Sequence, residues 1–423
     1  MESGISRKTE SRFTGKKIVI IGGGFGGLQV ALNLEKGLNG KDFQITLVDK
    51  REYHLFTPNL YEVATAEEEL ATVSQIKKSI TLPFKDLLQG KKIEFVQGAV
   101  TMVEAENNLV KLASKSISYD YLVLAIGSQS DYFNIEGAQK YSLPLKDFTD
   151  ALRIRNNIEF VISSQKYSIN QKNIRIIFAG GGYTGLELAC EMKGLIDYLS
   201  WKYQIPRNKI EIEIIEGSSK LIPGFDDRLS ADAYERLKDL GIHIRLSSRI
   251  VKVDEYFVWL DSGEKVAYNT LIWTAGVKAN PVTCSRVFNL DRKDRICVNK
   301  FFQVEPYQNI FAIGDLANMT GVNGQPVPCT AQDAWAEAKY LADALPLLVK
   351  NQRPKPFQNH KHGFIVNLGG KWAIVDYNLL YVKGFLGAVI GQFAHLRYYI
   401  SVVGLWGGIK WLLFQEDIFS RND

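Results

Sequence analysis

Two glycine-rich stretches carry the spacing G-x-G-x-x-G, at residues 22–27 and 180–185. Each follows an apolar run typical of a buried parallel strand and precedes apolar residues at helical spacing. Glycines in this pattern permit a tight turn, let the backbone approach a pyrophosphate, and let the following helix pack closely on the strand. The helix N-terminus then offers free N–H groups and a positive dipole to an anion. An isolated match to this spacing is weak evidence, so the surrounding elements decide its meaning.

An acidic residue ends the second apolar strand after each glycine motif. Asp49 closes the run that starts at Gln44, and Glu216 closes the run that starts at Ile210. A carboxylate at this point accepts hydrogen bonds from a ribose 2′-hydroxyl and repels a 2′-phosphate. We therefore predict two dinucleotide sites, and Glu216 favours NADH over NADPH at the second. Lys220 lies nearby and leaves that preference open.

The predicted cofactor contacts follow from these motifs and from the small-residue turns beside them. They are Gly22, Gly24, Phe25, Gly26, Gly27, Asp49, Lys50, Ala125 and Gly127 for the first site, and Gly180, Gly182, Tyr183, Thr184, Gly185, Glu216 and Gly276 for the second. The alternative for either motif is a glycine turn of an ordinary α/β protein that binds no ligand.

The elements that must position these residues occur twice in the same order. We predict strands at 17–21, 44–49, 174–179 and 210–216, and helices at 28–38, 186–200 and 330–349. Each unit closes on a short strand and a small-residue turn, at 121–127 and 271–276, and a third such strand and turn follow at 310–315. The predicted fold class is α/β, with two Rossmann-like dinucleotide-binding domains and an additional C-terminal segment.

Composition and charge narrow the class of protein. A chain of 423 residues is too long for one compact core, and its formal net charge of +5 is too mild for a dedicated nucleic-acid binder. The four cysteines form no C-x-x-C pair, which argues against a zinc site and a local redox disulfide and fits a reducing compartment. Residues 1–16 are polar with no apolar run behind them, so we expect a disordered leader and no secretory signal.

Two further stretches resemble the type II NADH dehydrogenases, a family within the pyridine nucleotide-disulfide reductase-like superfamily. They are residues 53–64 (YHLFTPNLYEVA) and residues 328–334 (PCTAQDA), and the second matches the first half of the family's A-Q-x-A-x-Q motif. Glu187 matches the family's glutamate beside the nicotinamide and quinone sites. Members of the family are single-subunit NADH:quinone oxidoreductases that pump no protons. The resemblance extends from about residue 17 to about residue 419.

The resemblance implies which glycine motif takes which cofactor. In FAD/NAD enzymes of this kind the FAD half comes first, is interrupted by the NAD half, and resumes with a Gly-Asp pair on the flavin side, here Gly314 and Asp315. The predicted boundaries are a leader at 1–16, an FAD-binding domain at 17–147 and 280–352, an NADH-binding domain at 148–279, and a C-terminal region at 353–423. FAD is expected to be non-covalent. It takes hydride from NADH, and two electrons pass on to a membrane quinone.

The resemblance also implies residues at the quinone end of the flavin. Ala331 and Gln332 match this part of the motif, and Gln332 is a candidate catalytic residue; the alternative is a helix start that only packs on the core. Glu187 is a candidate for proton handling or for ordering the two substrates, with stabilisation of a helix dipole as its alternative. The second glutamine of the motif is replaced by Ala336, which leaves the quinone type and pose open.

The C-terminal tail is the most apolar part of the chain, over residues 384–414. Polar and charged residues break the run, so no clean stretch of about 18 apolar residues remains for a spanning helix. We expect one or two amphipathic helices lying in the membrane interface, as in the family's corresponding tail. The alternative is a buried helix pair in a homodimer, because Gly384, Gly387 and Gly391 would allow close packing. Both a homodimer and a lipid contact are expected.

The resulting prediction is a peripheral FAD-dependent NADH:quinone oxidoreductase on the cytoplasmic face of the inner membrane. A sulfide:quinone reductase would need cysteines poised at the flavin, and the cysteine spacing shows no recognisable pair. A soluble ferredoxin-type reductase would leave the apolar tail unexplained. An alternative of another class is a non-catalytic flavin or NADH sensor that docks on a membrane.

Overall fold

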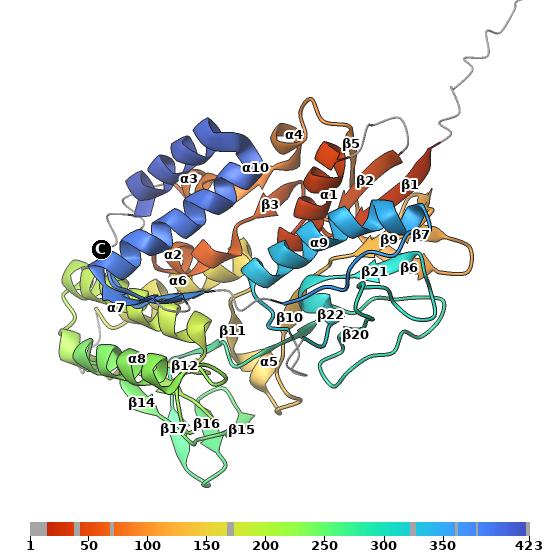
Figure 1. The fold of residues 1–423 in the computed structure, drawn as a ribbon. Coiled ribbons are helices and arrows are strands. Elements are labelled where there is room, and N and C mark those ends of the chain that lie inside the picture. The colour runs from red at the N-terminus through yellow and green to blue at the C-terminus, as the bar shows by residue number, and fades with distance from the viewer. Residues whose placement is uncertain are drawn as a thin grey trace, which may run out of the picture. The chain divides into compact units, whose positions relative to one another are not determined.

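The structure, a computed structural model, describes residues 15–37, 43–67, 72–166, 173–321, 327–359, 363–377 and 380–419 (Figure 1). The chain divides into two compact units. Unit 1 consists of residues 1–52, 88–127 and 281–358, and unit 2 of residues 53–87, 128–280 and 359–423. Residues 1–14 of the predicted leader lie outside the described residues, and Lys16 already belongs to the first strand.

Unit 1 is built on a five-stranded parallel sheet in the order β21-β9-β1-β2-β5. Its strands are β1 (Lys16–Ile21), β2 (Phe43–Asp49), β5 (Ile93–Gln97), β9 (Tyr121–Leu124) and β21 (Ile310–Ala312). The central strands are runs of Ile, Val and Leu because both faces of a parallel sheet are covered. Helix α1 (Phe25–Gly37) follows β1 and packs against α9 (Ala331–Val349). The last strand, β21, comes from far along the chain, as the predicted return to the first domain requires.

Smaller elements complete unit 1. An antiparallel sheet is formed by β6 (Val100–Glu104), β7 (Leu109–Leu112) and β8 (Ser116–Ser118), and a parallel pair by β20 (Ile296–Cys297) and β22 (Ala317–Asn318). The 3₁₀ turn η3 (Gly314–Leu316) follows β21.

Unit 2 repeats the parallel-sheet plan in the order β11-β18-β12-β13-β14. Its strands are β11 (Leu143–Pro144), β12 (Ile174–Ala179), β13 (Ile210–Ile215), β14 (His243–Arg245) and β18 (Thr270–Trp273). Its helices include α5 (Ala138–Tyr141), α6 (Phe148–Ser163), α7 (Tyr183–Tyr203) and α8 (Asp227–Asp239), and η2 (Arg207–Lys209) precedes β13. Antiparallel strands β15 (Ile250–Val253), β16 (Phe257–Leu260) and β17 (Lys265–Ala267) form a separate sheet, and β10 (Ser128–Ser130) pairs with β19 (Val277–Ala279).

The compact units differ from the predicted domain boundaries: residues 353–358 of the predicted C-terminal region cluster with unit 1 and residues 359–423 with unit 2. Residues 53–87 and 128–147 of the predicted first FAD segment cluster with unit 2. The physical reason for the first stretch is that α2 (Leu60–Thr65) packs against α6 and α7. The same stretch contains β3 (Tyr53–Leu55), η1 (Thr57–Asn59), α3 (Val73–Ile80), β4 (Thr81–Pro83) and α4 (Phe84–Leu87). A boundary set by sequence order could not anticipate this packing, and the predicted functional boundaries stay a prediction.

The C-terminal region of unit 2 is a three-stranded antiparallel sheet followed by a long helical segment. Strands β23 (Phe364–Asn367), β24 (Ala373–Tyr377) and β25 (Leu380–Gly384) precede α10 (Phe385–Phe419). Gly404 interrupts α10 with φ 77°. The chain then doubles back, because Gln415 donates to the Tyr399 hydroxyl at 2.8 Å across the bend, and the two legs are visible in Figure 1. The prediction of one or two helices is confirmed, and no helix within the described residues is long and apolar enough to cross a membrane.

The small residues at the start of α10 are used within the chain itself. A Cβ on Gly387 would lie 2.3 Å from the Ala373 carbonyl oxygen of β24, and one on Gly391 would lie 3.4 Å from the Ile365 side chain of β23. Both glycines therefore let α10 pack on its own sheet. This packing removes the argument that they serve a helix pair between two copies of the chain.

Candidate functional site

The first glycine motif lies at the carboxyl end of β1, and the protein's own packing explains three of its glycines. Gly22 has φ +103°, and a Cβ there would lie 2.3 Å from the Ala125 carbonyl oxygen on the neighbouring strand connection. A Cβ on Gly27 would lie 1.8 Å from the Gly22 carbonyl oxygen. A Cβ on Gly26 would meet the Ile313 side chain at 3.1 Å, where α1 approaches the end of β21. These positions let strand and helix approach each other closely.

Gly24 is different, because nothing in the described protein requires a glycine there. A Cβ would meet no atom of the described residues within 4 Å, and the residue is not in the left-handed region. Gly24 caps the start of α1, where backbone N–H groups lack helical partners. An open position at a helix N-terminus suits the close approach of a pyrophosphate. The motif therefore fits the phosphate part of a dinucleotide such as FAD.

Asp49 ties the glycine turn to the end of β2. Its Oδ2 accepts a hydrogen bond from the Gly23 N–H at 2.6 Å, and its Oδ1 accepts one from the Arg51 N–H at 2.8 Å. A carboxylate has roughly four acceptor positions, so capacity remains for a ribose hydroxyl. Lys50, between Asp49 and Arg51 in the sequence, is exposed.

The second glycine motif reproduces this geometry in unit 2. Gly180 has φ +106°, and a Cβ on Gly185 would lie 2.3 Å from the Gly180 carbonyl oxygen. At Gly182 a Cβ would again find open space among the described residues. Glu216 Oε2 accepts from the Gly181 N–H at 2.7 Å, and Oε1 accepts from the Ser218 N–H at 2.7 Å. The same division into packed and open glycines therefore occurs twice in one chain.

Four further residues concern the second site: Tyr183 and Thr184 within the motif, and Lys220 and Gly276 outside it. Lys220 donates to Asp227 Oδ1 at 2.5 Å, so its charge is partly neutralised by the first residue of α8. A Cβ on Gly276 would lie 2.6 Å from the Phe133 ring, which accounts for that glycine by packing. Tyr183 lies in the first turn of α7 and meets Phe364 edge to face at 5.6 Å, with Thr184 next to it, half-buried.

The structure assembles each predicted set of contacts within one unit. The residues predicted for FAD, including Phe25, Gly127 and Ala331, all belong to unit 1, and those predicted for NADH belong to unit 2. Within each parallel sheet they sit after the carboxyl ends of adjacent strands, which is where open α/β sheets bind ligands.

The Gly314–Asp315 turn lies against α9. Gly314 has φ +68°, a conformation that favours glycine, and its N–H donates to Glu337 Oε2 at 2.6 Å. Thr330 caps α9 by accepting from the Asp333 N–H at 3.1 Å. Gln332 is exposed in the first turn of this helix, so it does not pack on the core of unit 1. Sequence reasoning missed Glu337; its signal is an acid one turn after Asp333 on the buried face of a helix.

Glu187 lies in the second turn of α7, within a polar cluster of unit 2. The Asn367 N–H donates to its Oε1 at 3.3 Å, and Asn367 Nδ2 donates to the Tyr61 hydroxyl at 2.9 Å. Glu187 is half-buried by its surface exposure, and Glu191, one turn further along α7, is buried. Burial raises the pKa of Glu187 to about 8, against the opposing effect of the Asn367 N–H. The side chain can therefore gain or lose a proton near neutral pH, as a proton-handling group must.

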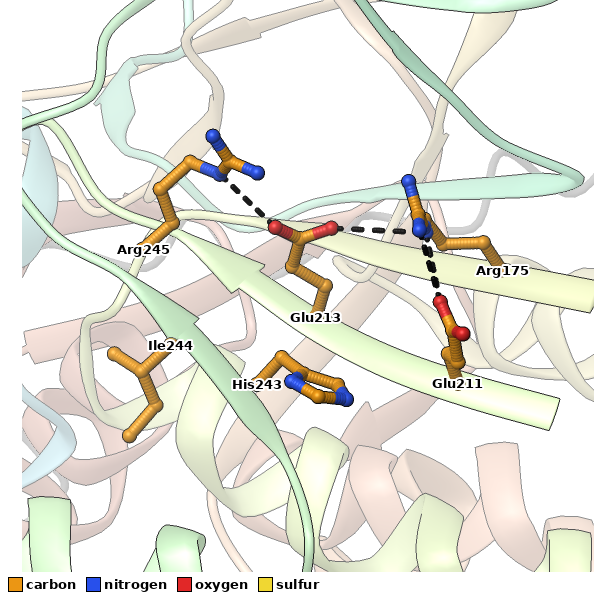
Figure 2. Close-up of a pocket in the computed structure, with 6 residues that line it drawn as sticks. All are labelled: Arg175, Glu211, Glu213, His243, Ile244 and Arg245. Atoms are coloured by element: carbon orange, nitrogen blue, oxygen red, sulfur yellow. Dashed lines mark hydrogen bonds and ion pairs between the residues drawn. The ribbon is translucent and has the colours of Figure 1, made fainter. Parts of the chain in front are cut away.

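A hollow in unit 2 is lined mostly by paired charges. Figure 2 shows Arg175, Glu211, Glu213 and Arg245 on one face of the sheet, with His243 and Ile244 completing the lining. Arg175 lies 3.0 Å from Glu211, and Arg245 lies 3.0 Å from Glu213. Arg175 and Glu211 stand at the amino ends of their strands, away from the glycine motif. The charges neutralise one another, so the hollow offers no uncompensated group to a ligand.

Comparisons with known proteins agree with this architecture. A model of the pyridine nucleotide-disulphide oxidoreductase family matches residues 16–338, and the chain belongs to that family. The predicted superfamily and the α/β dinucleotide-binding fold are confirmed.

Individual relatives indicate a narrower class of enzyme than the family model does. The chain is 29% identical over 429 residues to a probable NADH dehydrogenase of Dictyostelium discoideum, covering 96% of this chain and 91% of that protein. It is 29% identical over 363 residues to the type II NADH:quinone oxidoreductase of Staphylococcus aureus, covering 84% and 88% respectively. The solved structure of NDH2 from Plasmodium falciparum in complex with NADH matches with a TM-score of 0.84 at 21% identity, covering 96% of this chain and 99% of that one. At this identity the structural likeness shows the fold.

Proposed function

We propose that this chain is an FAD-dependent NADH:quinone oxidoreductase that pumps no protons. The observation that carries the proposal is the duplicated geometry of the two glycine motifs, each with one glycine whose Cβ would meet no atom of the described residues and would leave room for a ligand. The names carried by the two relatives support the reaction. In balanced form, NADH, a proton and a quinone give NAD⁺ and a quinol.

The first motif is the proposed FAD cradle. When bound there, FAD supplies the hydride acceptor and passes two electrons onward. The α1 N-terminus would neutralise the pyrophosphate, and Asp49 would accept from the ribose. Asp315 would contact the flavin side. The protein's part is to hold and orient the cofactor.

The second motif is the proposed NADH site. The α7 N-terminus would bind the NADH pyrophosphate, and the carboxylate of Glu216, held by two N–H groups, would accept from the adenosine ribose. The same negative charge would repel the 2′-phosphate of NADPH. The engagement of Lys220 by Asp227 supports a preference for NADH, because that cation is then less available to a phosphate.

Glu187 and Gln332 are the proposed residues for proton handling and quinone contact. With its pKa raised to about 8 by burial, the Glu187 carboxyl would hold a proton at neutral pH and could release it when the quinone is reduced. Gln332 would offer its amide to a quinone carbonyl. Ala336 has no amide to add, so Gln332 would act there without the second glutamine of the motif.

The proposed membrane contact is the outer surface of α10. Large apolar side chains are exposed along both legs of this helix, including Leu386, Phe393, Leu405 and Trp406, the last with 81% of its surface accessible. Exposed apolar patches of this kind mark membrane or protein contacts, and Trp favours the headgroup level. We place the enzyme as a peripheral protein on the cytoplasmic face of the membrane. A homodimer is also proposed, although the glycines of α10 do not support it.

Two alternatives remain distinguishable. A sulfide:quinone reductase needs a reactive cysteine pair. The structure describes all four cysteines, and none of them is in a disulfide. Burial raises the pKa of the Cys190 thiol well above its usual value, which disfavours the reactive thiolate. A non-catalytic sensor would bind FAD and NADH without passing electrons to quinone.

The reaction is tested by steady-state turnover of FAD-loaded protein with NADH and a short-chain quinone. We expect one quinone to be reduced for each NADH consumed, with sulfide unable to replace NADH. NADH consumption that depends on oxygen and not on quinone would contradict the proposal.

The membrane contact is tested with vesicles of phosphatidylcholine and phosphatidylglycerol. Trp406→Glu combined with Phe393→Glu is expected to release the protein into the supernatant after vesicle sedimentation, because charge is expelled from the apolar boundary. Trp201→Glu is the matched control, since Trp201 is 71% exposed and belongs to α7 instead of α10. Retention of the double variant, or equal release of the control, would refute this contact.

A further inference from the structure

Glu337 is a buried acid that the proposed function does not use. It lies on α9 with 3% of its surface accessible, and its Oε2 accepts the Gly314 N–H at 2.6 Å. Its other carboxyl oxygen has no hydrogen-bond partner among the described residues. The acid therefore holds the Gly314–Asp315 turn through one oxygen and keeps the second available.

The surroundings of Glu337 are mainly acidic. Asp333 lies one turn earlier on α9 and is 6% exposed, and Asp315 lies in the turn that Glu337 holds. The neighbouring thiol of Cys329 has its pKa raised by burial to about 11, so it stays neutral below that pH. Arg295 lies 3.9 Å from the Cys329 sulfur.

Among the described residues, no cation contributes to the pKa shift of Glu337. Arg295 is already paired with Asp291 at 2.7 Å. Helix α1 carries charges only in its last turns, at Glu35 and Lys36, whereas it meets α9 near Gly26, whose Cβ would lie 3.8 Å from the Ala334 carbonyl oxygen. Glu337 and Asp333 are both buried and Asp315 is half-buried, so an ionised Glu337 would be poorly hydrated and would face two other carboxyl groups.

Burial is the main cause that raises the pKa of Glu337 to about 8, and the charges of Asp333 and Asp315 add to it, while the Gly314 N–H opposes them. The acid form is therefore favoured at neutral pH. The ionised form would set a new negative charge against Asp315, in the turn proposed to contact FAD.

We propose that Glu337 is a positioning residue whose bond to the Gly314 N–H keeps the Gly314–Asp315 turn in the geometry that holds FAD, and that the negative charge it gains in alkaline solution weakens FAD binding by repulsion. The inference rests on the proposed assignment of the first motif to FAD. It does not depend on what accepts the electrons. The proton leaves to water, and no bond of the cofactor changes.

The direction of the effect follows from linkage. A negatively charged ligand and the Asp315 carboxylate both disfavour ionised Glu337, so FAD binds the acid form more tightly. The limiting loss of affinity equals the factor by which bound FAD lowers the acid dissociation constant of Glu337. We expect about tenfold weakening of FAD binding between pH 6.5 and 9.5, since one such charge shifts a pKa by about one.

The test measures the dissociation constant of FAD by quenching of its fluorescence, across that pH range, for the wild-type protein and three variants. Glu337→Gln keeps an acceptor for the Gly314 N–H and cannot ionise, so its affinity should match the wild type at low pH and stay flat. Glu337→Ala removes the acceptor and should weaken FAD binding at every pH. Asp343→Asn removes an exposed charge from the same helix and should behave as the wild type.

A flat wild-type profile, or a Glu337→Gln profile that falls like the wild type, would overturn the inference. Thermal unfolding of each FAD-free variant over the same range separates loss of the turn from loss of the fold. Failure of quinone reduction with this pH profile intact would remove the proposed function and leave the role of Glu337 standing. Failure of wild-type protein to bind FAD at pH 6.5 would overturn both.

Discussion

Replacing Gly182 by alanine should separate ligand binding from folding at the second glycine motif. Gly182 has φ −75° and ψ 172°, which alanine adopts freely, and its added Cβ would meet no atom of the described residues within 4 Å. Loss of a glycine cap at the start of α7 costs about 0.5–1 kcal/mol, and the lower entropy of the unfolded chain offsets about 0.4–1 kcal/mol. The free energy of unfolding should therefore change by no more than about 0.5 kcal/mol.

The same methyl group should weaken binding of the dinucleotide strongly. If the dinucleotide backbone approaches Gly182 closely, an added methyl overpacks the contact by about 1–3 kcal/mol. That range corresponds to roughly 5- to 150-fold weaker binding. NAD⁺ is the suitable probe, because it uses the same site without transferring hydride, and calorimetry gives its dissociation constant directly.

Gly185→Ala provides the contrast. Its Cβ would lie 2.3 Å from the Gly180 carbonyl oxygen and 2.7 Å from the Thr274 hydroxyl, so this variant should lose stability in denaturant unfolding. Unchanged NAD⁺ affinity in Gly182→Ala would refute the reasoning, as would a loss of stability as large as that of Gly185→Ala.

Three further predictions follow from the same sites. Gly24→Ala should weaken FAD binding about tenfold or more while leaving the apoprotein's unfolding midpoint nearly unchanged; normal FAD affinity in fluorescence titration would contradict the ligand-based explanation of that glycine. Glu216→Gln should raise the ratio of kcat/KM for NADPH over NADH by about tenfold, because the charge that repels a 2′-phosphate is removed; an unchanged ratio would count against the assigned acid. Glu187→Gln should flatten the fall in apoprotein stability between about pH 5 and 8. The reason is that an acid whose pKa is raised in the folded state stabilises the fold below its unfolded pKa and loses that contribution as the pH rises through about 8. Parallel stability curves for the variant and the wild type would show that Glu187 does not titrate in this range.

The sequence contained most of the fold because its local signals agreed with one another. Strand β12 spans Ile174–Ala179, the predicted range, because a run of β-branched residues between turn signals has few other structures open to it. The acids Asp49 and Glu216 were identifiable by their position after such strands. The return of the chain to the first sheet at β21 followed from the Gly-Asp pair of the resembling family.

Features that depend on packing between distant segments could not be predicted in the same way. The glycine pattern does not distinguish Gly24, where a Cβ finds open space, from Gly27, where it would strike the Gly22 carbonyl. The local sequence does not predict that α2 packs on α6 and α7. Glu337 looks like an ordinary helical acid until its burial and its bond to Gly314 are known. The roles of Glu187 and Gln332 stay predictions.

The central claim, that electrons pass from NADH through FAD to a quinone, is tested most directly by two half-reactions measured without oxygen. Protein loaded with stoichiometric FAD is mixed with NADH, and the visible absorption of oxidised flavin is followed; a short-chain quinone is then added. We predict that NADH bleaches the absorption and that the quinone restores it. Bleaching that the quinone does not reverse would contradict the quinone assignment and favour the sensor, and absorption that NADH leaves unchanged would contradict the whole account.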